Sequence, residues 1–289
     1  MKKWFTDDAI FDTINKVLIT IFSFMVAYPL LYVLFASISS GFAVDTGRVT
    51  FFPVDFTLAA YYETWGNMVF WRAYANSIFL TATGTAFSML VGLSGGYALS
   101  KKHLPGNRFF NFMMLFTMWF SAGMIPIYLN LQSLSLLNYA GLIIGFGVAP
   151  FAIVILRSAF ASVPKEIEEA GLIDGVNEFQ SFWHIAIPSI RPAMVTVSLM
   201  YGIMRWNGFF WAMIVVTEEQ WMPLQVYLRR LIILREGQWE SAEFFALAGH
   251  SQQTIIYSVI IMSIIPILLL FPFIQKVFKK GVMDGGLKG

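Results

Sequence analysis

An arginine inside an apolar stretch has the most demanding chemistry in this sequence. Arg205 lies about 12 residues into the apolar residues 193–216, roughly 18 Å along a helix that rises about 1.5 Å per residue. A charge at that depth in a membrane is costly unless it finds a partner or water. The acidic residues all lie outside the apolar stretches, so its partner is a backbone carbonyl, an acid of another subunit, a wet cavity or an anionic substrate.

Aromatic and amide side chains adjoin this arginine. Trp206, Asn207 and Phe210 follow it closely, and Trp119 and Asn76 lie in two other apolar stretches. Sugars stack their C–H faces on aromatic rings and hydrogen-bond their hydroxyls to amides, so these side chains are candidates for a substrate path. Packing between membrane helices is the competing role for each of them.

Enzyme chemistry has little support. His103, His184 and His250 are far apart and lack carboxylates at ligand spacing, so no metal site is predicted. The sequence has no Gly-rich phosphate loop of the type G-x-x-x-x-G-K-[ST], and no nucleophile–base arrangement stands out. The basic residues flank apolar stretches, which does not favour nucleic-acid binding. The chain is therefore predicted to be non-catalytic, with no cofactor of its own.

The composition is that of an integral membrane protein. The 289 residues are 57% hydrophobic and 12% charged, whereas a soluble domain carries about 25% charged residues. There is no cysteine, which excludes disulfides and thiolate metal sites. The expected fold class is all-α.

Six apolar segments are long enough to cross about 30 Å of hydrocarbon as helices. They cover approximately residues 17–38, 73–99, 109–131, 140–160, 193–216 and 254–274 of a single membrane domain, residues 1–289. The first is too long for a signal-peptide core and is expected to be retained. A further helix is expected at Leu224–Leu234, in the polar residues 217–253.

Basic residues predict the orientation. The lysines, all on the side of the N-terminus, are Lys2, Lys3, Lys16, Lys101, Lys102, Lys165, Lys276, Lys279, Lys280 and Lys288. The opposite loops hold only Arg48, Arg72, Arg229, Arg230 and Arg235. The positive-inside rule therefore places both termini and residues 162–192 in the cytoplasm.

Small residues recur every four positions in the second segment, at Gly84, Ser88, Gly92 and Gly96. Helices in lipid associate where small residues let their backbones approach closely. We expect this ridge to pack against another helix, either of the same chain or of a partner subunit.

Residues 162–192, the polar connection between the fourth and fifth segments, carry signals for a helix–Gly–helix. Pro164 suits a first helical position, and acidic residues follow it where the helix dipole favours them. Gly175 is expected to end the first helix. Asn177 is expected to cap a second one, and Pro188 to end it.

The second helix would carry an aromatic face of Phe179, Phe182 and Trp183. Such a segment could plug a groove on another protein or lie on the membrane surface, and the residues alone do not choose between these.

The polar connection resembles the cytoplasmic EAA loop of ABC-importer permeases. The similarity is carried by 169–171 (Glu-Ala-Gly), 174–175 (Asp-Gly) and 185–188 (Ile-Ala-Ile-Pro), with Gly171 in place of a second Ala and Ile187 in place of Leu. In that family the loop docks on the ATPase subunit. The coupling residues that the resemblance implies are Glu168, Glu169, Ala170, Gly171, Asp174, Gly175, Phe179, Ile185 and Pro188.

Other segments resemble carbohydrate-importer permeases of the maltose type. Residues 205–213 are similar to their W-N-x-F motif, and residues 116–126 and 222–230 are similar to a subgroup for complex oligosaccharides, some with uronic acids. Residues 280–289 resemble the tail of that group, which implies that Gly285, Gly286 and Lys288 lie at the ATPase.

The resemblance implies an importer permease with several partners. These are a homologous second permease in a heterodimer, two ATPase subunits that bind ATP and Mg²⁺, and an extracytoplasmic sugar-binding protein. The expected place is the bacterial cytoplasmic (inner) membrane, with lipid around a multi-pass chain. The expected cargo is an oligosaccharide, and Arg205 suggests an acidic, uronate-containing one such as alginate.

The competing functions are an ABC permease for amino acids or peptides and an ion-coupled secondary carrier. The residues around Trp206 argue against the former, and the lack of an acid in the apolar segments argues against the latter. A membrane scaffold without transport would leave the polar connection unexplained.

Overall fold

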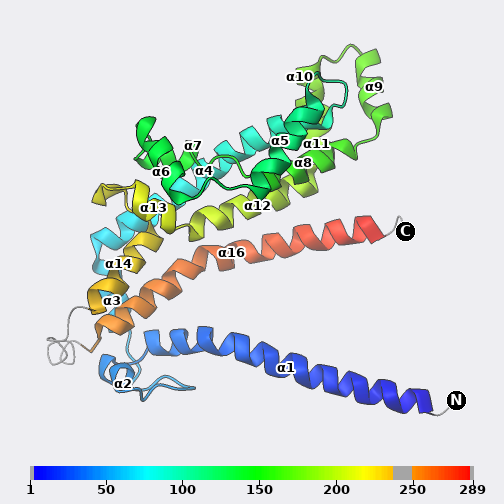
Figure 1. Cartoon of the computed structure of the whole chain (residues 1–289). Helices are drawn as coiled ribbons and strands as arrows, with labels where there is room; N and C mark the ends of the chain where they lie inside the picture. The colour runs from blue at the N-terminus through cyan, green and yellow to red at the C-terminus, as the bar shows by residue number, and fades with distance from the viewer. Residues whose placement is uncertain (1–2, 237–248, 287–289) are drawn as a thin grey trace. The chain divides into compact units, whose positions relative to one another are not determined.

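The computed structural model describes residues 3–236 and 249–286, and within these ranges the regular structure is helical throughout (Figure 1). The chain divides into two units. Unit 1 comprises residues 1–70 and 228–265, and unit 2 comprises residues 71–227 and 266–289. Each is described by itself.

Unit 1 contains three helices in its N-terminal part. They are α1 (Lys3–Ser37), α2 (Gly41–Asp45) and α3 (Ala59–Gly66). The unit also takes in the end of α14 (Leu224–Glu236) and the beginning of α16 (Gln252–Gly286). Helix α14 confirms the helix expected at residues 224–234.

Close backbone approach holds unit 1 together. The N–H of Gly41 donates to the carbonyl of Gly249 at 3.4 Å, and a Cβ on Gly41 would lie 2.4 Å from the backbone N of Ser251. Only glycine fits such a contact. The hydroxyls of Thr64 and Ser258 share a hydrogen bond of 2.6 Å, which ties α3 to α16.

Unit 2 holds most of the helices. They are α4 (Met68–Ser100), α5 (Asn107–Trp119), α6 (Met124–Ser133), α7 (Tyr139–Ile144), α8 (Pro150–Ala161), α9 (Lys165–Ile173), α10 (Glu178–Gln180), η1 (Ser181–Ala186, a π-helix), α11 (Ile187–Ser189), α12 (Arg191–Asn207), α13 (Phe210–Val215) and η2 (Glu219–Trp221, a 3₁₀ turn). The start of α14 and the rest of α16 also belong to this unit.

Three helices of the described residues have the length and hydropathy to cross a membrane. They cover Ile10–Ser37, Met68–Ser100 and Gln252–Pro272. These agree with three of the expected segments, residues 17–38, 73–99 and 254–274. The other three expected segments are each divided into two helices.

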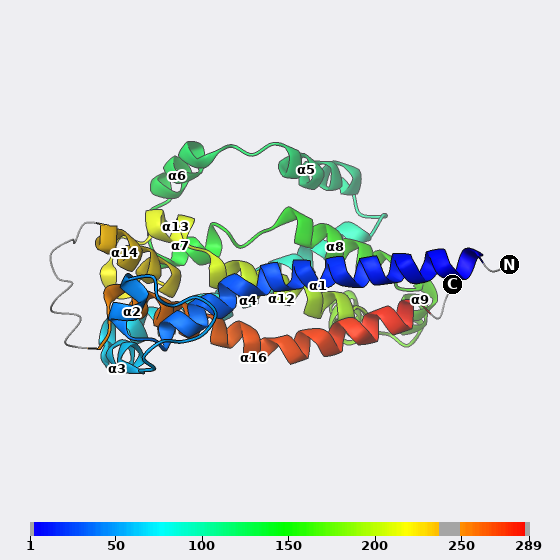
Figure 2. The ribbon, with the colours of Figure 1, turned by 90° about the horizontal axis from the view of Figure 1, so that it is seen from below.

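The divisions have local causes. Residues 120–123 separate α5 from α6, where Gly123 adopts a φ of +84°, and Figure 2 shows the extended link between the two helices. Ala149 is extended because Pro150 follows it, so α7 and α8 do not join. Extended Gly208 separates α12 from α13. Residues 109–131, 140–160 and 193–216 are therefore not continuous helices.

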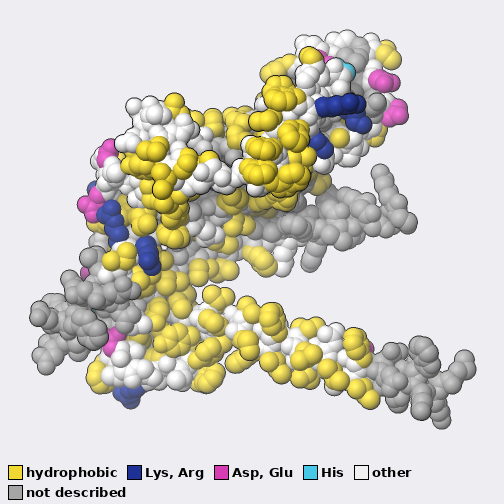
Figure 3. All heavy atoms as spheres, viewed as in Figure 1, with side chains coloured by type: hydrophobic (Ala, Val, Ile, Leu, Met, Phe, Trp, Pro, Cys, Tyr) yellow, Lys and Arg dark blue, Asp and Glu magenta, His cyan; other side chains and the backbone are white. Residues whose placement is uncertain are grey.

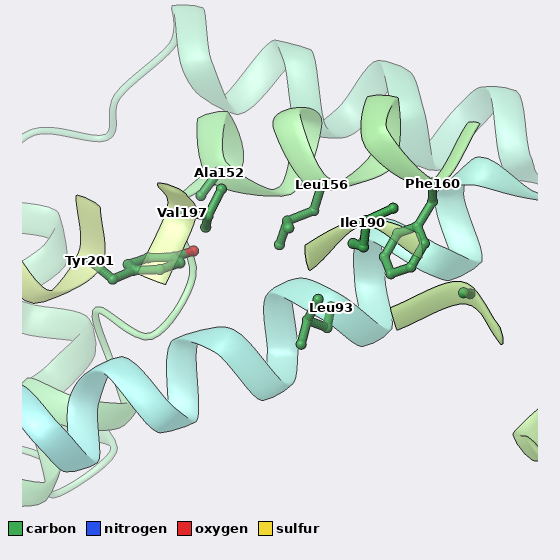
Figure 4. Close-up of a cluster of buried hydrophobic side chains, with 8 residues drawn as sticks. Leu93, Ala152, Leu156, Phe160, Ile190, Val197 and Tyr201 are labelled. Atoms are coloured by element: carbon green, nitrogen blue, oxygen red, sulfur yellow. The ribbon is translucent and has the colours of Figure 1, made fainter. Parts of the chain in front are cut away.

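The core of unit 2 joins α4, α8, α12 and the polar connection (Figure 4). Its buried side chains are Leu93, Ala152, Leu156, Phe160, Ala186, Ile190, Val197 and Tyr201. The small-residue ridge of α4 faces this core. A Cβ on Gly96 would lie 3.0 Å from Leu156 Cβ, and one on Gly92 would lie 3.2 Å from Leu156 Cδ1. Gly92 and Gly96 of the ridge thus pack on α8 of the same chain.

Candidate functional site

Arg205 is held by the C-terminal end of a short helix. Its guanidinium donates hydrogen bonds to the backbone carbonyls of Leu142, Ile143 and Phe146, the last at 2.7 Å. These carbonyls belong to the last residues of α7 or directly follow it. At the C-terminal end of a helix the dipole is negative, and the last carbonyls have no N–H partner within the helix. Of the partners that the sequence leaves open, the structure provides the backbone carbonyl.

Helix α4 makes room for this arginine. A Cβ on Gly84 would lie 3.1 Å from Arg205 Nε, and the buried hydroxyl of Ser88 accepts a hydrogen bond from Arg205 at 3.3 Å. One side chain therefore connects α12, α7 and α4. Gly84 and Ser88 of the small-residue ridge contact Arg205, while Gly92 and Gly96 contact α8.

A cavity of about 500 Å³ lies beside this arginine. It is lined by parts of α4, α7, α12 and α13 and includes Arg205, Asn207, Phe210 and Trp211. This volume lies within the range of about 300–1,000 Å³ that small-molecule sites occupy. Phe210 and Trp211 pack edge to face at 5.5 Å, and the ring of Trp211 also lies 4.9 Å from Phe146. Three of the side chains expected in a substrate path thus line one cavity.

The other expected path residues lie elsewhere. Trp206 is buried, packs edge to face on Tyr74 at 5.7 Å, and lines a second, apolar cavity of about 510 Å³. Asn76 donates to the carbonyls of Gln220 and Met222 at 2.8 and 3.1 Å, which fixes the chain before α14. Trp119, at the end of α5, is 75% exposed.

The polar connection forms the expected helix–Gly–helix. Helix α9 ends at Ile173, and Gly175 takes a φ of +79°, which favours glycine. Asn177 then caps α10: its Oδ1 accepts from the N–H of Gln180 at 2.9 Å, and the Gln180 side chain accepts from the N–H of Asn177 at 3.0 Å. This reciprocal pair is a capping box.

The expected end of the second helix is wrong. Helical structure continues through Pro188, as η1 and α11, and α11 ends at Ser189 with Ile190 as its C-cap. A proline lacks the N–H that an α-helix bonds four residues back. The wider π turn of η1, directly before it, accommodates the missing bond. Ile185, in η1, and Pro188, in α11, are both half-buried.

One face of the polar connection is buried in unit 2. Ala186 and Ile190 are in the core, and Phe182 packs on Tyr97 and Phe160 at 5.0 and 6.3 Å. Tyr97, near the end of α4, also donates to the carboxylate of Glu178 at 3.2 Å.

The other face is exposed and mixes apolar with acidic side chains. Two large apolar side chains are mostly exposed on this face, Ile173 at 87% and Phe179 at 72%. Glu169, Ala170, Asp174 and Gly175 are exposed as well, and Glu168 lies on the same helix, α9. Gly171 instead faces inward, with Ile185 against it. Figure 1 shows α9 projecting beyond the ends of α8 and α12.

The residues of the C-terminal tail are only partly described. Gly285 and Gly286 form the end of α16, and Lys288 lies outside the described residues.

Sequence reasoning missed a polar cluster where α4, α5 and α8 meet. Arg157 donates to Oδ1 of Asn111, and Asn111 donates to Oδ1 of Asn107 at 2.9 Å. Asn107 in turn donates to the carbonyls of Leu99 and Lys101, both at 3.0 Å. Two asparagines four residues apart at the start of an apolar helix are a signal that could have revealed it.

Comparison with known proteins identifies the family. Residues 107–284 match the family described as binding-protein-dependent transport system inner membrane component. Among curated proteins, the chain is 34% identical to the polygalacturonan/rhamnogalacturonan transport system permease protein YtcP of Bacillus subtilis over 97% of this chain and 99% of that one. It is also 34% identical to protein LplC of Bacillus subtilis, over 97% and 95% of the two chains.

A solved structure is similar along nearly the whole chain. It is described as the crystal structure of a bacterial ABC transporter involved in the import of the acidic polysaccharide alginate. The two chains are 42% identical, with a TM-score of 0.87 over 93% of this chain and 97% of the other. This chain is thus an inner membrane protein that belongs to the family of inner membrane components of binding-protein-dependent transport systems.

Proposed function

We propose that this chain is the permease subunit of an ATP-driven importer that carries an acidic oligosaccharide into the cytoplasm by alternating access. Membership of the transport-component family supports the permease role. The name of the relative YtcP refers to polygalacturonan and rhamnogalacturonan, and the similar solved structure is described as an importer of the acidic polysaccharide alginate; both support a uronate-containing cargo.

The proposed topology has six spans, with both termini and the polar connection in the cytoplasm. The placement of lysines supports this orientation. Three of the spans would each consist of two shorter helices. Non-helical backbone is tolerated at membrane depth where it lies within protein or lines a cavity, and the cavity beside Arg205 lies at two of the three breaks.

The proposed partners are a homologous second permease, two ATPase subunits and an extracytoplasmic sugar-binding protein. ATP and Mg²⁺ would bind to the ATPase subunits, so this chain would supply no catalytic group and hold no cofactor. The tail residues Gly285, Gly286 and Lys288 are proposed to lie at the ATPase as well.

The two-faced structure of the polar connection is the observation that carries this proposal. Its outer face exposes Ile173 and Phe179 beside acidic residues, which suits insertion into a groove of another protein. Its inner face is anchored in the core through Ala186 and Ile190. A push on the outer face would therefore move α4, α8 and α12, as a rigid-body switch between inward-open and outward-open states requires.

Glu169→Lys tests this docking in vesicles that contain the chain with its permease, ATPase and binding-protein partners. We expect the variant to lose assembly or to uncouple ATP hydrolysis from uptake, because it reverses a charge on the exposed face. Glu63→Lys, an exposed reversal on α3, is the matched control. Unchanged uptake by Glu169→Lys would contradict the docking role.

Phe179→Ser tests the apolar part of the same face. Phe179 is 72% exposed, so its loss should leave the stability of the chain unchanged while it weakens docking. Phe56→Ser, at a phenylalanine that is 68% exposed in unit 1, is the control for losing an exposed ring. Equal uptake by both variants would show that Phe179 makes no contact with the ATPase.

The cargo is tested by uptake of labelled uronic and neutral oligosaccharides of equal length. We expect the uronic oligosaccharide to be taken up in preference, in a manner that depends on ATP and on the binding protein. Preferred uptake of neutral sugars would contradict the acidic cargo but not the permease role. Uptake of amino acids or peptides instead would contradict the carbohydrate assignment.

A further inference from the structure

A groove in unit 2 lies apart from the cavities lined by Arg205 and by Trp206 and from the polar connection. It has a volume of about 550 Å³ and runs between the C-terminal part of α4 and helix α5. Its walls are almost wholly apolar, and they include Gly95, Ala98, Leu99, Phe110, Met113 and Met114. Helix α5 has no buried side chain, so this groove is an accessible surface of the described chain.

Basic side chains stand at one end of this groove. Leu104, Pro105 and Asn107 line it, and Lys102, His103 and Arg108 adjoin them in the sequence and are exposed. Figure 3 shows basic side chains beside hydrophobic ones where α5 begins.

These basic groups lack carboxylate partners. Among the described residues, Lys102, His103 and Arg108 form no ion pair, and the sequence has no acidic residue between Glu63 and Glu166. The neighbouring Lys101 differs, because its Nζ lies 4.5 Å from the ring centre of Tyr97. Lys102 and Arg108 thus carry exposed positive charge next to residues that line the groove.

The turn itself is held in place. Asn107 donates to the carbonyls of Leu99 and Lys101, both at 3.0 Å, which closes the turn on the end of α4. Gly106, with a φ of +78°, permits the sharp return into α5. Binding of a ligand to the basic groups would therefore lose little conformational entropy from their backbone, since that backbone is already fixed.

The position after α4 suits a turn at a membrane surface. Helix α4 is one of the three helices long and apolar enough to cross the membrane, and it ends at Ser100. The apolar groove lies on its last turns, and the basic turn follows directly, which is the order expected where a chain passes from hydrocarbon to the level of the lipid headgroups. Basic pockets between membrane helices bind anionic headgroups at this level.

We propose that this groove binds an anionic phospholipid, with an acyl chain between α4 and α5 and the phosphate group at Lys102 and Arg108. The ligand must be apolar over most of its length and negative at one end, because the groove is apolar and the turn is basic. A phospholipid of this charge meets both conditions and is present at the depth where the groove lies. The bound lipid would join α5, which has no buried side chain of its own, to α4.

The test is lipid titration of the purified importer complex in detergent, with bound lipids counted by native mass spectrometry. The probes are phosphatidylglycerol, which is anionic, and phosphatidylcholine, which has no net charge. We expect phosphatidylglycerol to bind more tightly. Lys102→Gln combined with Arg108→Gln should weaken its binding by about fivefold for each lost cation.

Two further variants separate the parts of the proposal. Ala98→Phe fills the groove from an exposed position, so it should weaken the binding of both lipids. Lys16→Gln combined with Arg72→Gln removes two exposed cations elsewhere and should change neither.

Equal binding of the two lipids by the unaltered complex would overturn the proposal, as would an unchanged affinity of the Lys102/Arg108 double variant. Displacement of phosphatidylglycerol by inorganic phosphate alone would show a simple anion site and would also overturn it. A thiol-directed crosslink from an Ala98→Cys variant to the second permease would show that a protein occupies the groove instead, and would overturn the proposal.

Discussion

Gly171 of α9 lies so close to Ile185 of η1 that a Cβ on the glycine would stand 2.6 Å from Ile185 Cδ1. Both residues belong to the segment that resembles the EAA loop, and this contact is where its two halves meet. The atom in the way is the end of a flexible side chain, so a small addition can be accommodated by a rotamer change. A larger one cannot.

Gly171→Ala should therefore reduce stability only slightly, and Gly171→Val should lift α9 off η1. Overpacking of this kind costs about 1–3 kcal/mol. We expect Gly171→Val to uncouple ATP hydrolysis from uptake in the reconstituted importer, while Gly171→Ala retains coupling. Ile185→Val should rescue part of the loss, because it removes the methyl group that blocks the new side chain. A Gly171→Val protein with normal coupling would show that this contact transmits nothing.

The pair Gly84 and Arg205 gives a second prediction. A Cβ on Gly84 would lie 3.1 Å from Arg205 Nε, so Gly84→Ala should push the guanidinium off the α7 carbonyls. Hydrogen bonds to charged groups contribute about 1.5–3 kcal/mol, and we expect a loss of this size in the free energy of unfolding in denaturant. In an Arg205→Met background the same Gly84→Ala change should cost little, because the obstructed group is gone. Additive effects would contradict the contact.

Arg205→Lys separates the two roles of this residue. Lysine keeps the charge but cannot reach several carbonyls at once, because it has no planar fork of donors. If Arg205 only caps α7, uptake of uronic and neutral oligosaccharides should fall equally in Arg205→Gln and Arg205→Lys. If the charge also meets the substrate, Arg205→Gln should lose uronic uptake selectively, and Arg205→Lys should retain part of it.

Two adjacent glycines of α4 should respond in opposite ways to alanine. At Gly96 a Cβ would lie 3.1 Å from the backbone N of Arg157, which cannot move alone, so Gly96→Ala should lower the free energy of unfolding by about 1–3 kcal/mol. At Gly95 the nearest atom is Ile153 Cδ1 at 3.8 Å, an ordinary contact. Gly95→Ala should therefore leave stability unchanged or raise it by up to about 1 kcal/mol. Equal losses at both positions would refute the packing described for the ridge.

Two hydroxyls one turn apart on α4 should also differ. The buried oxygen of Thr85 has no hydrogen-bond partner among the described residues, whereas the hydroxyl of Ser88 serves Arg205. Replacing an unsatisfied hydroxyl by a methyl group of the same shape removes a penalty of about 1–3 kcal/mol, so Thr85→Val should be neutral or stabilising. Ser88→Ala should be destabilising. Thermal unfolding of the purified chain compares the two, and a destabilised Thr85→Val would mean that its hydroxyl is paired.

Local signals in the sequence predicted the polar connection well. Gly175 and Asn177 act through their own backbone and side-chain chemistry, and both take the expected roles. The ridge on α4 was also predicted, since the spacing of Gly92 and Gly96 alone defines a face. The spacing does not say which helix packs on Gly92 and Gly96. The structure shows that this helix is α8 of the same chain.

Local sequence signals did not predict the helix breaks inside three of the apolar segments. Hydropathy measures whether a segment suits lipid and does not report where its helix stops. Just after the division at Gly208, Trp211 packs on Phe146, a tertiary contact that hydropathy does not report. Trp206 shows the same limit: its proximity to Arg205 in the sequence suggested a shared site, but it turns to Tyr74 and a different cavity. Pro188 does not end the second helix, because a π turn with no evident sequence signature precedes it.

The hydrogen bonds of Arg205 restrict how this half of a transporter can deform. Sliding α12 along α4 would separate the Arg205 guanidinium from the Ser88 hydroxyl and the Phe146 carbonyl, and a part-buried cation that loses its acceptors is costly. The segments that meet at this guanidinium are therefore expected to travel as a single block. Bending would then occur in connections that do not contact Arg205, such as the non-helical residues 120–123 between α5 and α6.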